Sequence, residues 1–396
     1  MTWLSLIGIG ADGLDGLSAR ARRVLAAAEV LVGGTRHLAL LPDDPRPRLS
    51  WRSPLAATLP EILALRPRQV AVLATGDPLW YGIGRLLLQH LSPVEVAIVP
   101  HVSAFQEACS RLGWTLEEAF PLTAHGRPVA SLRRHFQPGR RLLVLTSDGA
   151  GPAAIARCLV ADGYGDSPVT VLEAMGDEAE RRTDAPAAAL QERFGELNLV
   201  AVELCATAQP RPSVPGLPDE AYEHDGQLTK AEIRAVTLAA LAPCDGELLW
   251  DVGAGAGSVA IEWLRAGRGM RAVAVERDPT RAARIAANAE RLGVPELIVH
   301  TGAAPDALAE LPGPQAIFVG GAVAAPGLLG LCWRRLASGG RLVANAVSVA
   351  GEAAVLAFHA AQGGRLLRLQ ITRAEPIGAQ LAWRPAMPVT QLVARK

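Results

Sequence analysis

The chain has few cysteines, no net charge and no long uninterrupted hydrophobic run. Its five cysteines are odd in number and widely scattered among 396 residues, without C-x-x-C spacing or a nearby histidine pattern. A disulfide framework and a zinc site are therefore not indicated, and we predict reduced, buried thiols and no metal. The 39 Lys and Arg residues balance 39 Asp and Glu residues, which argues against a broad electrostatic surface for nucleic acid.

The amino terminus, MTWLSLIGIG, lacks a basic leader and is typical of a strand rather than a signal peptide. No apolar run approaches the roughly 20 residues that span a bilayer. We therefore expect a soluble cytoplasmic protein without a membrane or nucleic-acid partner. The length is sufficient for two domains of ordinary size.

The most informative stretch is LLWDVGAGAGS at 248–258, where a short apolar run leads into Asp251 and three alternate glycines. The following VAIEWLRAG has apolar residues spaced for one face of a helix. A strand, a glycine turn and a helix in that order let a nucleotide-like ligand lie against bare backbone. The spacing G-x-G-x-G differs from the dinucleotide pattern G-x-G-x-x-G, and Asp251 suits a ligand with a cationic amino acid moiety. A second strand from Arg271 ends in Glu276, where an acid reads ribose hydroxyls in such folds.

The rest of the second half continues this alternation. We predict a basic amphipathic helix over 279–292 and strands over 298–300, 316–319 and 342–346, with small residues or Asn345 at the strand ends. The stretches 366–371, 380–383 and the closing MPVTQLVAR predict terminal antiparallel strands. Before the glycine stretch, Thr229 and Glu232 have the spacing of a helix capping box.

The first half also alternates strands and helices, with small residues after each strand. Strands are predicted over 3–9, 70–74, 94–99, 141–146, 169–172 and 197–204, and a further one in AEVLVGG at 28–34. This pattern favours a parallel α/β sheet with ligands at the carboxyl ends of its strands. Loops 8–13, 74–78, 100–104 and 123–127 are the expected site. The proline-rich residues 206–227 predict a linker, which gives domains over 1–205 and 228–396.

Five motifs of the first half, LIGIGADG, VGGTRHL, LATGDPLWYGIG, VPHVSAFQEACSRLGW and LTAHGR, resemble the tetrapyrrole (class III) methyltransferases. The resemblance implies S-adenosylmethionine (SAM) bound by the Gly-Asp-Pro and serine loops. The second half resembles a class I, Rossmann-like SAM methyltransferase through GQLTKAEIRAVTLAAL, DVGAGAGS, IFVGG and LVANAV. Its Val319-Gly320-Gly321 loop matches the corrin branch of that class rather than nucleic-acid methyltransferases.

The fusion of these two halves resembles the decarboxylating methyltransferases of aerobic cobalamin biosynthesis. It implies SAM-dependent C-methylation of precorrin-6B at C5 by the first half and at C15 by the second, with loss of the ring C acetate carboxylate, giving precorrin-8. One SAM is expected in each domain, and relatives of each half self-associate, so a homo-oligomer is expected. We assign no catalytic residue.

The candidate site residues follow from these motifs. Candidate cofactor-binding residues are Gly76, Asp77, Ser103, Ala104, Thr229, Asp251, Gly253, Gly255, Gly257, Glu276, Gly302 and Ala303. Candidate substrate-binding residues are Gly8, Gly10, Arg36, His37, His101, Arg127, Gly320, Gly321 and Asn345, with Arg234 as a further basic candidate for the substrate's carboxylates.

Other readings stay open at this stage. Each basic residue could equally be a surface cation or helix cap, and Asn345 could equally be a satisfied turn. A two-domain NAD(P)-dependent reductase and a non-catalytic SAM-binding module are the main alternatives, and a nucleic-acid methyltransferase is a third.

Overall fold

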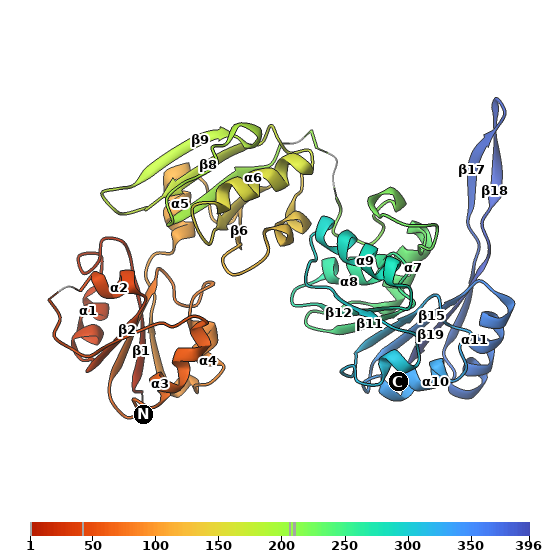
Figure 1. Ribbon diagram of the computed structural model, residues 1–396, viewed down its shortest axis with the longest axis horizontal. Helices are drawn as coiled ribbons and strands as arrows, with labels where there is room; N and C mark the ends of the chain where they lie inside the picture. The colour runs from red at the N-terminus through yellow and green to blue at the C-terminus, as the bar shows by residue number, and fades with distance from the viewer. Residues whose placement is uncertain (1, 42, 206, 209–210) are drawn as a thin grey trace. The chain divides into compact units, whose positions relative to one another are not determined.

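The computed structural model describes residues 2–41, 43–205, 207–208 and 211–396, which fold as two compact units (Figure 1). Unit 1 comprises Met1–Arg127 and Pro138–Ala208, and unit 2 comprises Pro128–Gln137 and Gln209–Lys396. The division therefore differs from a simple cut at residue 205, because one segment from the first half packs in unit 2.

The first sheet of unit 1 is five-stranded and parallel, in the order β3-β2-β4-β1-β5. Its strands are β1 (Leu4–Ile9), β2 (Val30–Gly33), β3 (Arg48–Ser50), β4 (Val70–Thr75) and β5 (Val96–Val99). Alternate side chains of β1 face opposite sides. Leu4 and Leu6 pack toward α3 (Leu59–Leu63) and α4 (Gly84–Leu88), whereas Ile7 and Ile9 pack toward α1 (Ala19–Ala26) and α2 (Thr35–Ala39).

The second sheet of unit 1 corrects the prediction of a single parallel sheet. Its order is β6-β7-β10-β8-β9, and only the β6–β7 pair is parallel. The strands are β6 (Ala119–Thr123), β7 (Arg141–Leu145), β8 (Pro168–Glu173), β9 (Arg181–Pro186) and β10 (Asn198–Glu203), with helices α5 (Ala104–Leu112) and α6 (Gly151–Ala161). Apolar runs identify strands but carry no direction, and the polar edge strand β9 has no apolar run to identify it.

Unit 2 contains a seven-stranded sheet of order β13-β12-β11-β14-β15-β19-β16, in which β19 is antiparallel to both its neighbours. The strands are β11 (Leu248–Val252), β12 (Arg271–Glu276), β13 (Ile298–Thr301), β14 (Ala316–Val319), β15 (Arg341–Ala346), β16 (Arg365–Leu369) and β19 (Val389–Arg395). The predicted terminal antiparallel strands are thus present. The expected α/β class holds for both units.

Helices cover both faces of this sheet, so its central strands β11, β14 and β15 are buried on both sides. Helices α7 (Ala231–Leu241), α8 (Ser258–Ala266) and α9 (Pro279–Arg291) pack over Leu249 and Ala274. Helices α10 (Leu328–Arg335) and α11 (Val349–Gln362) pack over Trp250 and Val252. This burial explains the near-continuous apolar runs of the parallel strands.

A two-stranded hairpin, β17 (Thr372–Ile377) and β18 (Gln380–Pro385), forms a sheet of its own. Figure 1 shows it projecting from the body of unit 2. The shorter helical turns of the chain are η1 (Leu55–Thr58), η2 (Pro93–Glu95), η3 (Val129–His135), η4 (Ala187–Ala189), η5 (Asp219–Ala221) and η6 (Asp306–Leu308).

The predicted linker is only partly a linker. Residues 206, 209 and 210 lie outside the described residues, but Leu217 and Tyr222 are buried in the core of unit 2 beside α7 and α8. This packing could not be predicted from the sequence, which shows only prolines, polar residues and isolated apolar side chains. The segment packs through Leu217 and Tyr222 and through backbone hydrogen bonds, so it has no helical or strand periodicity.

Candidate cofactor and substrate sites

In unit 2 the carboxyl ends of four strands are joined by backbone hydrogen bonds. Gly253 donates to the carbonyl of Val275 at 2.9 Å, Gly302 to that of Glu276 at 2.9 Å, and Gly320 to that of Val252 at 3.0 Å. The structure thereby brings the candidates Gly253, Gly302, Ala303, Gly320 and Gly321 to one edge of the sheet. Parallel strands present their carboxyl ends together, and such an edge is where α/β sheets hold ligands.

Gly253 must be glycine for two reasons. Its φ is +72°, and an added Cβ would lie 2.8 Å from the amide nitrogen of Gly321. Any side chain would therefore separate the loops that follow β11 and β14. The glycine thus allows close contact with the backbone of Gly321, and the approach of a ligand to this turn stays a prediction.

Both carboxylate oxygens of Glu276 accept hydrogen bonds from backbone amides, one of them in the glycine turn. Its Oε2 accepts from the amide of Gly255 at 2.8 Å, and its Oε1 accepts from the amide of Asp278 at 3.1 Å. The side chain is buried. The acid therefore fixes the turn's shape, and a ribose would have to bind to a carboxylate already held in place by backbone donors.

Asp251 lies beneath the turn and is only 1% exposed. Its Oδ2 accepts from the amide of Ala260 in the first turn of α8 at 3.0 Å, while Oδ1 is buried with no hydrogen-bond partner among the described residues. Burial, and secondarily the negative charge of Glu276, raises the pKa of Asp251 to about 7. A nearby cation would favour the ionised form.

Several predicted residues have structural partners instead. Asn345 donates to Thr237 Oγ1 at 2.9 Å and accepts from Gln391 at 2.9 Å, so both ends of its amide are occupied. Gly257 borders α9, because an added Cβ would lie 2.7 Å from Cγ2 of Ile285. The prediction that Thr229 caps a helix is wrong: α7 is preceded by Lys230, without a side-chain cap, and Glu232 pairs with Arg373.

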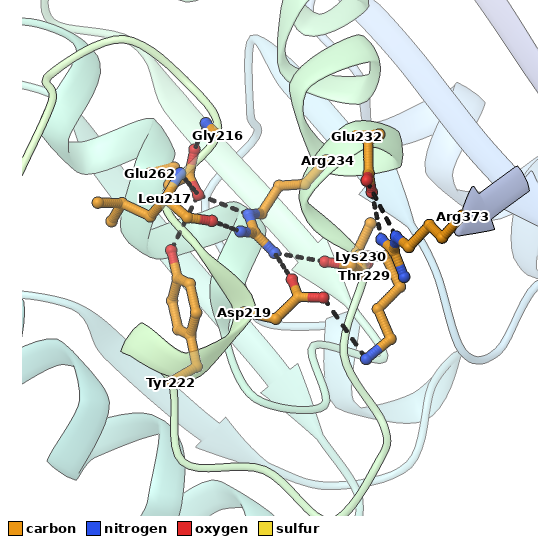
Figure 2. Close-up of polar contacts among 10 residues, drawn as sticks. All are labelled: Gly216, Leu217, Asp219, Tyr222, Thr229, Lys230, Glu232, Arg234, Glu262 and Arg373. Carbon is orange, nitrogen blue, oxygen red and sulfur yellow. Dashed lines mark hydrogen bonds and ion pairs between the residues drawn. The ribbon is translucent and has the colours of Figure 1, made fainter. Parts of the chain in front are cut away.

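The suggestion that Arg234 holds substrate is also wrong. Its side chain is 0% exposed and forms an ion pair with Glu262 in the interior of unit 2 (Figure 2). From sequence alone, an arginine on a helix is expected to be a surface cation. The burial of Arg234 could not be foreseen because its acidic partner, Glu262, lies on another helix.

In unit 1 three strand ends converge in the same manner. Gly76 donates to the carbonyl of Ile9 at 3.2 Å, and His101 donates through its amide to the carbonyl of Gly76 at 3.2 Å. A Cβ on Gly8 would lie 2.0 Å from that same carbonyl oxygen. Gly8 is therefore required by close packing of the loops after β1, β4 and β5.

Arg36 and His37 meet at one hydroxyl. Arg36 Nη2 donates to Thr75 Oγ1 at 2.7 Å, and His37 Nε2 lies 2.8 Å from the same oxygen. Burial, and then the charge of Arg36, lowers the pKa of His37 to about 4. His37 is therefore neutral at pH 7 and acts here as a hydrogen-bonding group, not as the cation expected for binding carboxylates.

The remaining unit 1 candidates border these loops. Asp77 accepts from the amide of Leu79 at 2.8 Å, and Ser103 caps α5 by accepting from the amide of Gln106 at 3.3 Å. Ala104 opens the same helix. A Cβ added to Gly10 would lie 2.4 Å from Oδ1 of Asp12. Nε2 of His101 lies 3.1 Å from the carbonyl oxygen of Gly16.

Sequence reasoning missed three residues at these edges. Thr75 joins Arg36 and His37, and Tyr81 has its ring 5.5 Å from the guanidinium of Arg127 and a φ of +57°. In unit 2 the carbonyl of Gln227 reaches Gly255, 2.8 Å from where a Cβ would lie. Thr75 and Tyr81 belong to the quoted LATGDPLWYGIG motif and Gln227 to the quoted GQLTKAEIRAVTLAAL motif, although Gln227 was also assigned to the end of the linker.

Family models match both units. Residues 4–191 match tetrapyrrole (corrin/porphyrin) methylases, and residues 220–396 match a precorrin methyltransferase domain. The fold, the glycine-lined strand ends and these matches define a SAM-dependent methyltransferase, an enzyme with SAM as its methyl donor.

Full-length relatives narrow the assignment. A precorrin-6Y C(5,15)-methyltransferase (decarboxylating) of a Sinorhizobium species is 48% identical, over 98% of this chain and 95% of the relative. The protein of the same name from Mycobacterium tuberculosis (strain CDC 1551 / Oshkosh) is 43% identical, over 98% of each chain. A cobalt-precorrin-7 C(5)-methyltransferase of Salmonella typhimurium is 34% identical, over 50% of this chain and 98% of its own.

The chain belongs to the precorrin-6Y C(5,15)-methyltransferase (decarboxylating) family of cobalamin biosynthesis. This membership decides against the reductase, the non-catalytic module and the nucleic-acid methyltransferase.

Two searches of the described residues gave negative results. No helix in residues 2–41, 43–205, 207–208 and 211–396 is long and apolar enough to cross a membrane. Within the same ranges, His, Cys, Asp and Glu side chains do not gather in a group of three or more that could hold a metal ion.

Proposed function

We propose that unit 1 methylates C5 of precorrin-6B and that unit 2 methylates C15 and removes the ring C acetate carboxylate, giving precorrin-8. The observation that carries this proposal is the presence of two separate glycine-lined strand edges, one in the parallel sheet of unit 1 and one in unit 2. A half-length relative named for C5 methylation alone supports a division of the two positions between units.

The residues at the unit 2 edge fit SAM. Gly253 lets the loops after β11 and β14 close together at the carboxyl ends of the strands, and the buried, unpartnered Oδ1 of Asp251 lies beneath this turn. SAM supplies an electrophilic methyl group on its sulfonium. The meso carbons of a reduced tetrapyrrole are already nucleophilic, so the chain's main contribution is alignment of the two reactants.

In unit 1, cationic side chains at the strand ends would hold the substrate's carboxylates by charge-assisted hydrogen bonds. Arg36 is positioned through Thr75, and Arg127 against Tyr81. His37 contributes as a neutral partner of Thr75.

Decarboxylation breaks the bond between the acetate methylene and the carboxylate carbon. Carbon dioxide leaves, and the electron pair moves into a protonated pyrrolenine of the substrate. The protein's part is a pocket that weakens solvation of the departing carboxylate.

We further propose a cytoplasmic homo-oligomer without a nucleic-acid or membrane partner. The exposed apolar side chains of the β17–β18 region, Ile377, Leu381, Trp383 and Met387, support self-association. A two-stranded hairpin is marginal alone and gains stability when its apolar side chains are covered.

The proposal is tested by supplying the full chain with tetrapyrrole and SAM labelled at its methyl carbon. Wild type should add two methyl groups and release one carbon dioxide, with carbon NMR locating the label. An Asp77→Ala variant should retain C15 methylation and decarboxylation, and Gly321→Leu should retain only C5 methylation. Loss of both methylations from either variant, with the fold intact, would refute the division between units.

A further inference from the structure

The guanidinium of Arg234 binds one continuous segment of the chain, residues 216–229. Its Nη1 donates to the carbonyl of Thr229 at 2.5 Å and to Asp219 Oδ1 at 3.3 Å, and its Nη2 donates to the carbonyl of Leu217. Its Nε donates to Oε1 of Glu262 on α8 at 2.5 Å. Figure 2 shows Arg234 enclosed by this segment.

The carboxylate oxygens of Glu262 also accept hydrogen bonds from the same segment. It accepts from the amides of Gly216 at 2.6 Å and Leu217 at 3.2 Å, and from the hydroxyl of Tyr222 at 3.0 Å. The Arg234 guanidinium also lies 4.8 Å from the centre of the Tyr222 ring. The pair therefore replaces the ladder hydrogen bonds that this stretch lacks, since its only helical turn is η5.

The segment held in this way borders the glycine turn. The carbonyl of Gln227 closely approaches Gly255. Asn288 of α9 donates to the carbonyls of both Glu223 at 3.0 Å and Ala256 at 3.1 Å, and so ties the segment to the turn. Displacement of residues 216–229 would remove one wall of the turn.

We propose that Arg234 and Glu262 are positioning residues for the SAM site of unit 2, which hold residues 216–229 against the glycine turn. The inference rests on the proposed function for the location of that site. A buried ion pair is weak evidence for stability, because apolar replacements of such pairs are often neutral. The relevant observation is that this pair's hydrogen bonds converge on the segment beside the turn.

A second, partly buried pair in unit 2, Arg341 and Glu247, provides a control. Arg341 donates to both carboxylate oxygens of Glu247 at 2.7 Å and to the carbonyl of Leu241, at the end of α7, at 2.7 Å. Arg341 begins β15 and Glu247 precedes β11, so this pair lies at the amino ends of the strands. Both pairs contact α7, but only Arg234–Glu262 contacts the segment beside the glycine turn.

The experiment compares Arg234→Gln/Glu262→Gln with Arg341→Gln/Glu247→Gln in the full chain. Each double substitution removes one positive and one negative charge. SAM is titrated by calorimetry, thermal midpoints are recorded without SAM, and limited proteolysis reports on residues 211–228. We expect both variants to lower the midpoint, but only the first to weaken one of two SAM sites, by about tenfold or more, equivalent to about 1.4 kcal/mol.

The C15 step in the first variant should show a raised KM for SAM with C5 methylation unchanged, and cleavage within 211–228 should accelerate. Equal loss of SAM affinity in both variants, or unchanged affinity while the segment is cleaved, would overturn the inference. If the first variant does not fold, Tyr222→Phe, which removes one hydrogen bond to Glu262, should still weaken the same site, and unchanged affinity would again overturn it. A wild-type chain with one SAM site would instead refute the proposed function.

Discussion

The amide of Gly255 donates to Oε2 of Glu276 over 2.8 Å, so the acid at the end of β12 holds the turn that follows β11. The second oxygen is also occupied, by the amide of Asp278. The loops after β11 and β12 thus bind the same carboxylate, so a substitution of Glu276 should alter the conformation of both loops.

Glu276→Gln tests this sharing. The amide has one acceptor oxygen, so one of the two backbone donors loses its partner, which costs about 1–3 kcal/mol. We expect a lower unfolding free energy for unit 2 and weaker SAM binding at that site alone, measured by denaturant melts and calorimetry. Glu247→Gln serves as the control, since it should lower stability without changing SAM affinity. An unaltered SAM isotherm for Glu276→Gln would show that the turn does not depend on this acid.

Asp251 should make SAM binding by unit 2 dependent on pH. Its pKa of about 7 in the free protein should fall when a cationic ligand binds, so binding releases a proton. Affinity should then decrease below pH 7, approaching tenfold per pH unit, and level off above it. Calorimetry between pH 5.5 and 8 in buffers of different ionisation enthalpy measures the proton release. Asp251→Asn should abolish this dependence, and a flat profile in wild type would contradict it.

The Asp251 carboxyl should also make the stability of the free protein depend on pH, but stability should fall as pH rises whereas SAM affinity should increase. Its folded-state pKa lies above its unfolded value, so the folded state binds more protons, and Asp251 should make stability fall as pH rises from about 4 to about 7. Asp251→Asn should therefore be more stable than wild type above pH 7, by an amount on the order of a few kcal/mol. Thermal melts of the SAM-free chain across this range would measure it, and equal stability at pH 8 would count against the burial argument.

Arg36→Ala should weaken tetrapyrrole binding while SAM affinity is unchanged. The substitution removes the donor to Thr75 and a cation near the strand ends of unit 1. Fluorescence titration with tetrapyrrole, beside calorimetry with SAM, distinguishes the two effects. Arg157→Ala, which removes an exposed partner of Glu192, is the control and should alter neither. Unchanged tetrapyrrole affinity would remove Arg36 from the site.

Leu381→Ser/Trp383→Ser should reduce self-association. These side chains are 72% and 75% exposed on the projecting hairpin, and their replacement removes apolar area that a second copy would cover. Light scattering after size exclusion measures the mass. Val349→Ser, at an 88% exposed position on α11, is the matched control. A wild-type monomer, or an oligomer insensitive to the double substitution, would refute this role.

The sequence was most informative where glycine has a strict geometric reason. Gly253 and Gly8 stand where another backbone comes too close for any side chain, so both strand edges could be located in advance. The order of apolar runs likewise placed β14 and β4 well, because buried parallel strands have no polar alternation to obscure them.

What could not be predicted depends on partners distant in sequence. Arg234 looks like a surface cation until Glu262, on another helix, is placed beside it. Asn345 is satisfied by Thr237 and Gln391 from separate elements. The strands at 169–172 and 197–204 were predicted, but their antiparallel direction was not, because strand direction depends on connections that periodicity does not encode.

Residues 128–137 lie between β6 and β7 in the chain but pack in unit 2, where Arg134 bonds to Glu296 at 2.6 Å, 162 positions away. During synthesis this segment leaves the ribosome well before Glu296 is translated, so the ion pair of Arg134 can form only after much of the second half has been made. One polypeptide therefore carries all of unit 2, including residues 128–137, whereas a cut at residue 205 would separate that segment from the rest of the unit.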